Sequence, residues 1–481
     1  MKERIILVQP RVGDWDDFRS HPALPLALLS VSREIAGDFD ISLVDTRIDK
    51  DWRQSLIKEL DRGALCVGVT SMTGGQINHA LEVSRVVKEN SSIPVVWGGI
   101  HASMFPESTI QDDFIDAIVV GEGERTFQKL VCALAGGRDL SGIPGIWYKD
   151  GSRIVKNQLH DFLKLDSLPQ LPLGLIKLNK YLPVFKGRRT FYLETSRGCP
   201  NSCSFCYNPS FNRSNWRAFS IARTLEDIGF LYRVHRVRSF YIVDDNFFVD
   251  LQRARSVAQG IIDQGMDIIW EAQGISINSA LKMDEGYLSV LERSGLRKVH
   301  FGVESGSERI LRLVNKRIRI EDVIKINQRW RKFNIIAQYN FMCGFPGERM
   351  KDLRMTVDLV FKLMKENPNA LISPLCPYTP YPGTALYNNQ MGKRFRKRAT
   401  LREWSQTNYG DNLWQSKRRK KILSALFFAS QFLDTHRSKD MVQSRLIKIL
   451  ISLYRPIAKF RVKHLFFGFM PELKVKEFFT K

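Results

Sequence analysis

The sequence has few cysteines and no long apolar run, and each shortage excludes a class of protein. Its 481 residues contain seven cysteines, an odd number, and three of these lie within eight positions. This pattern does not suggest a disulfide framework, so we expect a cytoplasmic protein. No apolar stretch reaches the length of a membrane span. The charged start Met1–Arg4 is followed by an apolar run too short for a signal peptide.

Positive charge is plentiful, and it is concentrated at one end of the chain. The formal net charge is +23. Residues 393–481 contain 22 Lys and Arg against 6 Asp and Glu, so this segment holds +16 of the total. Whatever partner the basic surface binds, we expect the C-terminal segment to bind it.

The first part of the chain alternates short apolar strands with helical patterns. Strands this apolar are typical of a parallel sheet that is covered on both faces, so we predict a Rossmann or flavodoxin-like α/β domain. Ligands of such sheets bind at the carboxyl ends of the strands. The predicted strands are Arg4–Gln9, Ile41–Asp45, Leu65–Thr70, Ile93–Gly98 and Asp116–Val120. The predicted helices are Pro25–Ile35, Asp51–Leu60, Ile77–Glu89 and Glu124–Ala135.

A second alternating region follows a predicted hairpin around Ile146–Gly151 and a proline-rich linker at Leu168–Pro183. Repeated βα units of this length favour a partial TIM-like barrel with active residues at the strand ends. The predicted strands are Thr190–Ser196, Ser239–Val243, Ile268–Gln273, Lys298–Val303, Ile335–Phe341 and Ala370–Leu375. We therefore divide the chain into a Rossmann-like domain (1–140), a hairpin and linker (141–184), a partial barrel (185–390) and a basic, mostly helical C-terminal region (391–481).

Three cysteines with the spacing CxxxCxxC follow the first barrel strand. Cys199, Cys203 and Cys206 could fold around one iron–sulfur cluster. A cubane cluster has four irons, so three thiolates leave one iron open, and an open position on a metal is what catalysis needs. A structural zinc knuckle is the alternative, but no His or Cys lies between Cys206 and His235 to supply a fourth ligand.

This loop, with an aromatic residue before its last cysteine, resembles the hallmark of the radical S-adenosylmethionine (SAM) enzymes. The resemblance implies that Cys199, Cys203 and Cys206 hold a 4Fe–4S cluster whose open iron is chelated by SAM. It also implies cleavage of SAM to a 5′-deoxyadenosyl radical and a flavodoxin or ferredoxin type of reductant protein. Further family landmarks stand at successive strand ends, and the implied SAM-binding residues are Asp244, Asp245, Asn246, Glu304 and Ser305.

The N-terminal region is similar to the cobalamin-binding domain that precedes the barrel in one radical SAM subgroup. No histidine fits the DxHxxG pattern of other cobalamin proteins, and the subgroup also lacks that pattern. Cobalamin would then be bound without a protein histidine on cobalt; His101 also fits a loop histidine bonded to backbone. The cobalamin-binding residues that the resemblance implies are Ser71, Thr73, Gly98, Gly99, His101, Gly121 and Glu122.

The basic segment carries apolar residues among its charges. The clusters Lys393–Arg398 and Lys417–Lys421 stand near the apolar runs Ile422–Phe428 and Leu465–Met470. This mixture favours peripheral contact with the inner face of a membrane over nucleic acid, although basic clusters also bind phosphates. A solvated face is the third alternative.

The closest resemblance is to cobalamin-dependent radical SAM methyltransferases and the anaerobic magnesium-protoporphyrin ester cyclase. We expect methylation of an unactivated carbon on a hydrophobic, lipid, terpenoid or tetrapyrrole-like substrate, because Pro377–Thr384 offers an aromatic, proline-rich wall. A cyclase or rearrangement enzyme is the second hypothesis. A corrinoid or iron–sulfur sensor with a nucleic-acid-binding tail is the non-enzyme alternative.

Overall fold

The computed structural model describes residues 2–13, 16, 21–391, 398–407, 415–433, 445–470 and 472, with side chains for all of these except 445–447. They form two compact units. The first contains the described residues up to 183, with 381–383 and 398–407; the second contains the rest. Of the basic cluster Lys393–Arg398, only Arg398 lies within the described residues. No described helix is long and apolar enough to cross a membrane.

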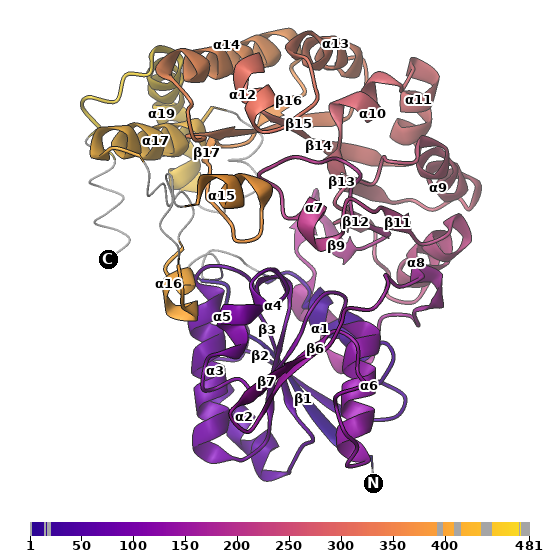
Figure 1. Cartoon of the computed structure of the whole chain (residues 1–481). Coiled ribbons are helices and arrows are strands. Elements are labelled where there is room, and N and C mark those ends of the chain that lie inside the picture. The colour runs from indigo at the N-terminus through magenta and orange to yellow at the C-terminus, as the bar shows by residue number, and fades with distance from the viewer. Residues whose placement is uncertain are drawn as a thin grey trace. The chain divides into compact units, whose positions relative to one another are not determined.

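The first unit is a seven-stranded sheet in the order β2-β1-β3-β4-β5-β6-β7 (Figure 1). Its first five strands run parallel, and the last two are antiparallel. The strands are β1 (Arg4–Gln9), β2 (Asp40–Asp45), β3 (Val67–Thr70), β4 (Val95–Gly98), β5 (Ala117–Val119), β6 (Ile146–Asp150) and β7 (Arg153–Lys156). The helices are α1 (Leu26–Ser32), α2 (Trp52–Asp61), α3 (Gln76–Asn90), α4 (Ile100–Met104), α5 (Pro106–Ile110), α6 (Glu124–Ala135) and α16 (Leu401–Ser405).

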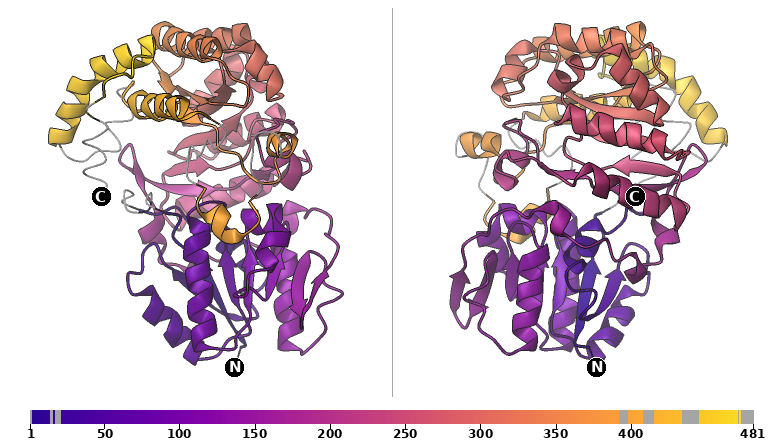
Figure 2. Two further views of the ribbon diagram at one scale, coloured as in Figure 1. Left: turned by 60° about the vertical axis from the view of Figure 1, so that its left-hand side comes forward. Right: turned by 90° about the vertical axis from the view of Figure 1, so that its right-hand side faces the viewer.

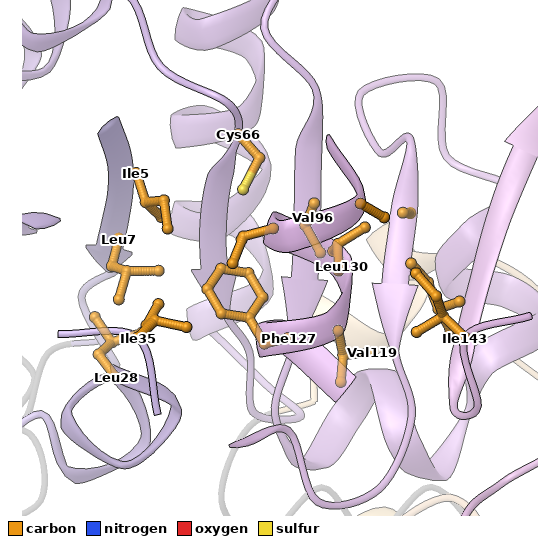
Figure 3. Close-up of a cluster of buried hydrophobic side chains, with 14 residues drawn as sticks. Ile5, Leu7, Leu28, Ile35, Cys66, Val96, Val119, Phe127, Leu130 and Ile143 are labelled. Atoms are coloured by element: carbon orange, nitrogen blue, oxygen red, sulfur yellow. The ribbon is translucent and has the colours of Figure 1, made fainter. Parts of the chain in front are cut away.

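A hydrophobic core of this unit lies between the sheet and α6, where side chains of the strands pack against those of the helix. Leu7, Val96 and Phe127 lie in one buried cluster, which also contains the thiol of Cys66 (Figure 3). Gly68 on β3 leaves room for this packing, because a Cβ there would meet Leu7 at 2.7 Å. The proline-rich segment predicted as a linker lies within this unit, where it forms two short 3₁₀ turns, Leu173–Leu175 and Leu178–Tyr181.

The second unit is a curled, largely parallel sheet in the order β16-β15-β14-β13-β12-β9-β8, with β17 beside β15. Its strands are β8 (Val184–Phe185), β9 (Arg188–Leu193), β10 (Ser196–Arg197), β11 (Arg217–Ala218), β12 (Ser239–Ile242), β13 (Ile269–Ile275), β14 (Leu296–Glu304), β15 (Ile336–Cys343), β16 (Ala370–Ile372) and β17 (Cys376–Pro377). The short pair β10 and β11 forms a separate ribbon. The predicted α/β class with a partial barrel is confirmed.

Helices cover one face of this curled sheet (Figure 1). Phe301 on β14 contacts Trp330 at the end of α13, with ring centroids 5.1 Å apart, so the odd positions of that strand face the helices. The helices are α7 (Asn208–Phe211), α8 (Ile221–Arg233), α9 (Leu251–Asp263), α10 (Ile277–Leu281), α11 (Glu285–Arg293), α12 (Glu308–Leu313), α13 (Ile320–Trp330), α14 (Met350–Glu366), α15 (Ala385–Gln390), α17 (Lys417–Ser430) and α19 (Arg445–His464).

Candidate functional site

The three predicted cysteines lie in the loop between β10 and α7. The loop turns at Gly198, whose φ of +88° and close approach to Asn215 leave no room for a Cβ. The Cys199 N–H donates to Asn208 Oδ1 (2.9 Å), and the Cys206 N–H donates to the Cys203 carbonyl (3.1 Å). These bonds fold the loop back on itself, so that its three thiols are neighbours on one short segment.

N–H groups point at two of the sulfurs. Asn201 Nδ2 lies 3.4 Å and Asn246 Nδ2 3.7 Å from Cys199 Sγ, and the Asn208 N–H lies 3.5 Å from Cys206 Sγ. Hydrogen bonds to the sulfurs are one means by which proteins set the reduction potential of iron–sulfur clusters. Burial, with smaller contributions from the nearby Cys203, Asp245 and Cys199, raises the pKa of the Cys206 thiol to about 12, although the Asn208 N–H opposes the shift. A bound cation would remove these protons, since metal coordination deprotonates a thiol.

The cysteine loop offers three thiols as metal donors. Among the side chains that the structure describes, no three of His, Cys, Asp or Glu are grouped closely enough to hold one metal ion. Structural zinc needs four ligands, and no His or Cys lies between Cys206 and His235 to supply the fourth. A cubane cluster has four irons, so three thiolates would hold three of them. The donor set therefore fits a cluster with one position left open.

Asp244, just after β12, fastens the start of this loop. The Thr195 N–H, the Thr195 hydroxyl and the Ser196 hydroxyl each donate to its carboxylate at 2.6 Å. Burial raises the pKa of Asp244 to about 6, although these hydrogen bonds oppose the shift. The side chain is engaged by the loop, so its observed part is to position the loop.

Asp245 and Asn246 approach the cysteines from the same strand end. Asp245 accepts from the Gly198 N–H (3.0 Å) and the Tyr207 hydroxyl (2.7 Å), on either side of the cysteine loop. Asn246 is buried, and its Oδ1 has no hydrogen-bond partner among the described residues. A buried acceptor without a donor costs free energy, so Asn246 is open to a ligand that brings a donor.

Glu304 and Lys316 form a buried ion pair at the end of β14. Lys316 Nζ donates to Glu304 Oε1 at 3.0 Å, and Glu304 has a φ of +69°, a backbone conformation uncommon outside glycine. Gly302 makes room for the pair, because a Cβ there would meet Glu304 Oε1 at 2.6 Å and Lys316 Nζ at 2.8 Å. The neighbouring Asn315 donates to the Ser202 carbonyl at 2.7 Å. This tie fixes the ion pair beside the cysteine loop.

Ser305 is placed differently from Glu304. It is fully buried, its hydroxyl lies 3.2 Å from that of Thr356 on α14, and it accepts from the Ser307 N–H at 3.1 Å. A small pocket beside the ion pair is lined by Cys203, Ser276, Asn315 and Lys316 among others. Ser305 is not among its lining residues.

A polar network on the face of the sheet opposite the helices was not predicted from the sequence. Glu271 lies 3.2 Å from Lys298 and 4.0 Å from His300, and Gln338 donates to His300 Nδ1 at 3.2 Å. Burial alone would raise the pKa of Glu271, yet His300 and Lys298 lower it below its ordinary value. The alternation of Lys298 with His300 along one strand was the available signal.

In the first unit, five of the seven predicted cobalamin residues meet at the carboxyl ends of β3 and β4. The Ser71 hydroxyl donates to the Gly98 carbonyl (3.0 Å), and Thr73 Oγ1 lies 2.9 Å from His101 Nδ1. Gly99 has a φ of +94°, and a Cβ there would meet Ser71 O at 2.6 Å. Glycine is thus required at position 99 because a side chain there would collide with the backbone of Ser71.

The remaining two predicted residues follow β5. A Cβ on Gly121, as on Gly98, would meet nothing within 4 Å, so both glycines border open space, as a cradle for a large flat ring requires. Glu122 instead accepts from the Leu163 N–H at 2.9 Å, which holds the segment after the hairpin. The carboxyl edge therefore fits a corrinoid through its glycines and hydroxyls, while the Glu122 side chain anchors the chain.

His101 is buried beneath a helix from the far end of the sequence. Its Nε2 has no hydrogen-bond partner among the described residues, and burial lowers the pKa of the ring to about 4. Trp404 on α16 contacts the His101 ring edge-on (centroids 6.1 Å apart) and the Phe105 ring (5.4 Å). The sequence reasoning missed Trp404, although Thr400 and Glu403 form a capping box that marks the start of α16.

Comparisons with known proteins match one family to a segment of each unit. The model of the radical SAM superfamily matches residues 193–360, and that of the B12 binding domain matches residues 20–131. An uncharacterized methyltransferase of Pyrococcus horikoshii is 31% identical over 370 residues, which span 76% of this chain and 77% of the relative. The anaerobic magnesium-protoporphyrin IX monomethyl ester cyclase of Rubrivivax gelatinosus is 28% identical over 407 residues, 80% of this chain and 69% of the cyclase.

Two solved structures share the fold. TsrM from Kitasatospora setae, a radical SAM methyltransferase with cobalamin and a 4Fe–4S cluster bound, superposes with a TM-score of 0.70 and 18% identity over 89% of both chains. The cobalamin-dependent SAM radical enzyme OxsB gives a TM-score of 0.75 and 18% identity over 95% of this chain and 72% of OxsB.

Proposed function

The chain belongs to the cobalamin-dependent radical SAM enzymes, and from this membership we propose that it methylates an unactivated carbon of its substrate. The cofactors of this family are a 4Fe–4S cluster, SAM and cobalamin. We assign corrinoid binding to residues 1–140 and radical chemistry to residues 185–390. The observation that carries the proposal is the geometry of the cysteine loop. N–H groups donate to two of its sulfurs, and Oδ1 of the neighbouring Asn246 accepts no hydrogen bond from the described residues.

We propose that Cys199, Cys203 and Cys206 hold the cluster. When bound, the cluster and cobalamin supply one-electron cleavage of SAM and methyl transfer. Asp244 and Asp245 keep the loop in place through their bonds to Thr195 and Gly198.

Two residues near the loop are proposed to contact SAM. Asn246 Oδ1 accepts from the SAM ammonium group, because it is a buried acceptor without a donor. Glu304 accepts from the ribose hydroxyls, held in position by Lys316. Ser305 supports this site by fixing the backbone after β14 against α14.

For the corrinoid, we propose contact at the carboxyl edge of the first sheet. Gly98 and Gly121 admit the ring, since open space borders both. The ring would lie between two loops, whose shape depends on Ser71, Thr73, Gly99 and His101. Glu122 acts through the backbone that it anchors.

We propose a substrate with a hydrophobic body and a reductant protein of the flavodoxin or ferredoxin type. Phe205 of the cysteine loop is partly exposed and packs at a tilt against the buried Phe345 (centroids 5.9 Å apart), which stacks on the buried Tyr378 (5.2 Å). A partly exposed aromatic ring at the edge of such a cluster suits an apolar ligand. The network around Glu271 and His300 would meet a polar group on the same molecule.

Ring formation is the second candidate reaction, favoured by the 28% identity to the protoporphyrin ester cyclase. Methyl transfer converts one SAM to S-adenosylhomocysteine, while radical cleavage of another gives methionine and 5′-deoxyadenosine. The reconstituted enzyme should therefore form both products when incubated with extract of its own cells. Formation of 5′-deoxyadenosine without S-adenosylhomocysteine would favour the cyclase, and formation of neither would contradict both.

We also propose that the C-terminal region contacts the inner face of a membrane. The apolar run Ile422–Phe428 does not supply the contact surface, because Leu423 and Leu426 on α17 are buried in the second unit. The helix that follows in the described chain, α19, has the required exposed residues.

A further inference from the structure

Helix α19 has an inner face that fixes it to the second unit. Ala458 and Val462 are fully buried, and the Tyr454 ring contacts Phe428 and Phe432 on and just after α17 at centroid distances of 6.2 and 5.0 Å. Arg354 on α14 donates to the Lys463 carbonyl at 2.6 Å. The orientation of the helix about its axis is therefore set by packing (Figure 2, where α19 is yellow).

The outer face of α19 is apolar and exposed. Its large side chains are half or more exposed, with Leu453 at 69%. At the roughly 100° turn per residue of an α-helix, they fall within an arc of about 100°. The residues are Ile449, Leu450, Leu453, Ile457 and Phe460, and we call them the apolar stripe. An exposed stripe of this kind marks an interaction surface.

The stripe continues into the chain that follows α19. The Phe466 ring lies 6.3 Å from that of Phe460, and Phe469 is 72% exposed. Arg461 donates to the Phe469 carbonyl at 2.7 Å, which holds this segment against the helix.

Lysine side chains lie along one side of the apolar stripe, and helix α19 has no acidic residue. Arg445–His464 contains no Asp or Glu. Lys448, Lys459 and Lys463 are exposed and fall on the arc next to the stripe. Aliphatic side chains at the centre with lysines at the edge match the layered chemistry of an anionic lipid surface. Nucleic acid would instead require the basic groups at the centre of the contact.

We propose that the apolar stripe of α19 inserts into the headgroup region of an anionic membrane, with Lys448, Lys459 and Lys463 contacting lipid phosphates. This deepens the membrane contact proposed above. It names the helix face and the lipid class, and it does not depend on the reaction that the enzyme catalyses.

The test is sedimentation of the full-length holoenzyme with vesicles. Vesicles of phosphatidylcholine and phosphatidylglycerol in equal parts should bind the native protein, and vesicles of phosphatidylcholine alone should bind it more weakly. The double variant Leu453→Asp, Ile457→Asp should bind the mixed vesicles at least about tenfold more weakly, since two aliphatic side chains that the lipid would bury are lost. Val234→Asp is the matched control, because Val234 is 61% exposed on another helix end of the same unit; it should bind like the native protein.

Further outcomes separate the lipid surface from its rivals. The triple variant Lys448→Gln, Lys459→Gln, Lys463→Gln should lose the preference for phosphatidylglycerol. Equal vesicle binding by the native protein and the double aspartate variant would overturn the proposal. Two other results would also overturn it. One is a native dimer that the double aspartate variant loses while its vesicle binding is unchanged; the other is vesicle binding that added RNA abolishes equally in the native protein and in this variant. SAM cleavage, measured on the same samples, should be unchanged in every variant; its absence from all of them would count against the proposed reaction alone.

Discussion

Three consecutive residues at the end of β12 act on the cysteine loop in different ways. Asp244 holds Thr195 and Ser196, Asp245 holds Gly198 and Tyr207, and Asn246 reaches Cys199. The type of residue was visible in the sequence, because polar groups at the end of a buried strand indicate a site. Their separate partners lie 38 to 49 positions away along the chain, and only tertiary structure brings them together.

The close contact of Gly302 with the Glu304–Lys316 pair gives a prediction at the scale of single residues. Gly302→Ala should weaken SAM binding about tenfold, because the added methyl group displaces the Glu304–Lys316 pair. Isothermal titration with SAM measures the change. Gly286→Ala is the control: its Cβ meets nothing closer than 3.5 Å on α11, so SAM should bind as tightly as to the native enzyme. Equal affinities of the two variants would contradict this role of Gly302.

His101 gives a pH dependence. Burial depresses its folded-state pKa to about 4, below the ordinary 6.5, so its stabilising contribution is present above pH 6.5 and is lost as pH falls toward 4. From pH 7 to pH 5 the free energy of unfolding should fall by about 2 kcal/mol more in the native protein than in His101→Gln. Denaturant unfolding monitored in the first unit measures it. An identical pH response of the two proteins would show that His101 is not buried neutral.

At the scale of elements, the sequence predicted every parallel strand of both units except the two-residue β17. The apolar runs were unambiguous, and β1 was predicted to the residue. The sequence reasoning did not name α4, α5, α7, α10, α13 or α15. All of these except α13 have six residues or fewer, too short for a helical period to appear. Helix α13 is mostly polar with a narrow buried face of Val323, Ile326 and Trp330. Helix α16 lies in a region predicted to be basic and mostly helical, but its bounds and its contact with His101 required the fold.

Helix α16 should shield His101 from solvent. Trp404→Ala removes the ring that packs on His101 and Phe105, at a cost of about 3 kcal/mol against detachment of the helix. Diethyl pyrocarbonate should then modify His101, which mass spectrometry of peptides detects. Arg402→Ala, an exposed change on the same helix, should leave His101 protected. Protection that persists in the tryptophan variant would mean that α16 does not cover the histidine.

For the whole molecule, the uneven charge was readable from composition and the two α/β units from motif order, and one family model matches within each unit. Which element exposes an apolar face was not readable. The sequence pointed to the apolar runs Ile422–Phe428 and Leu465–Met470, yet the leucines of the first are buried on α17, and exposed leucines lie on α19, which neither run includes. Which face of a helix a protein covers depends on its neighbours, here Phe428 and Phe432 against Tyr454.

The central claim is that three thiolates hold a cluster with one open iron at which SAM is cleaved. Anaerobic reconstitution with iron and sulfide, followed by measurement of bound iron and of 5′-deoxyadenosine after reduction, tests it most directly. The native protein and the control Cys132→Ala, altered on α6 of the other unit, should bind a 4Fe–4S cluster and form 5′-deoxyadenosine. Cys203→Ala should lose the cluster and the product while still binding cobalamin. Undiminished SAM cleavage by Cys203→Ala would contradict the claim.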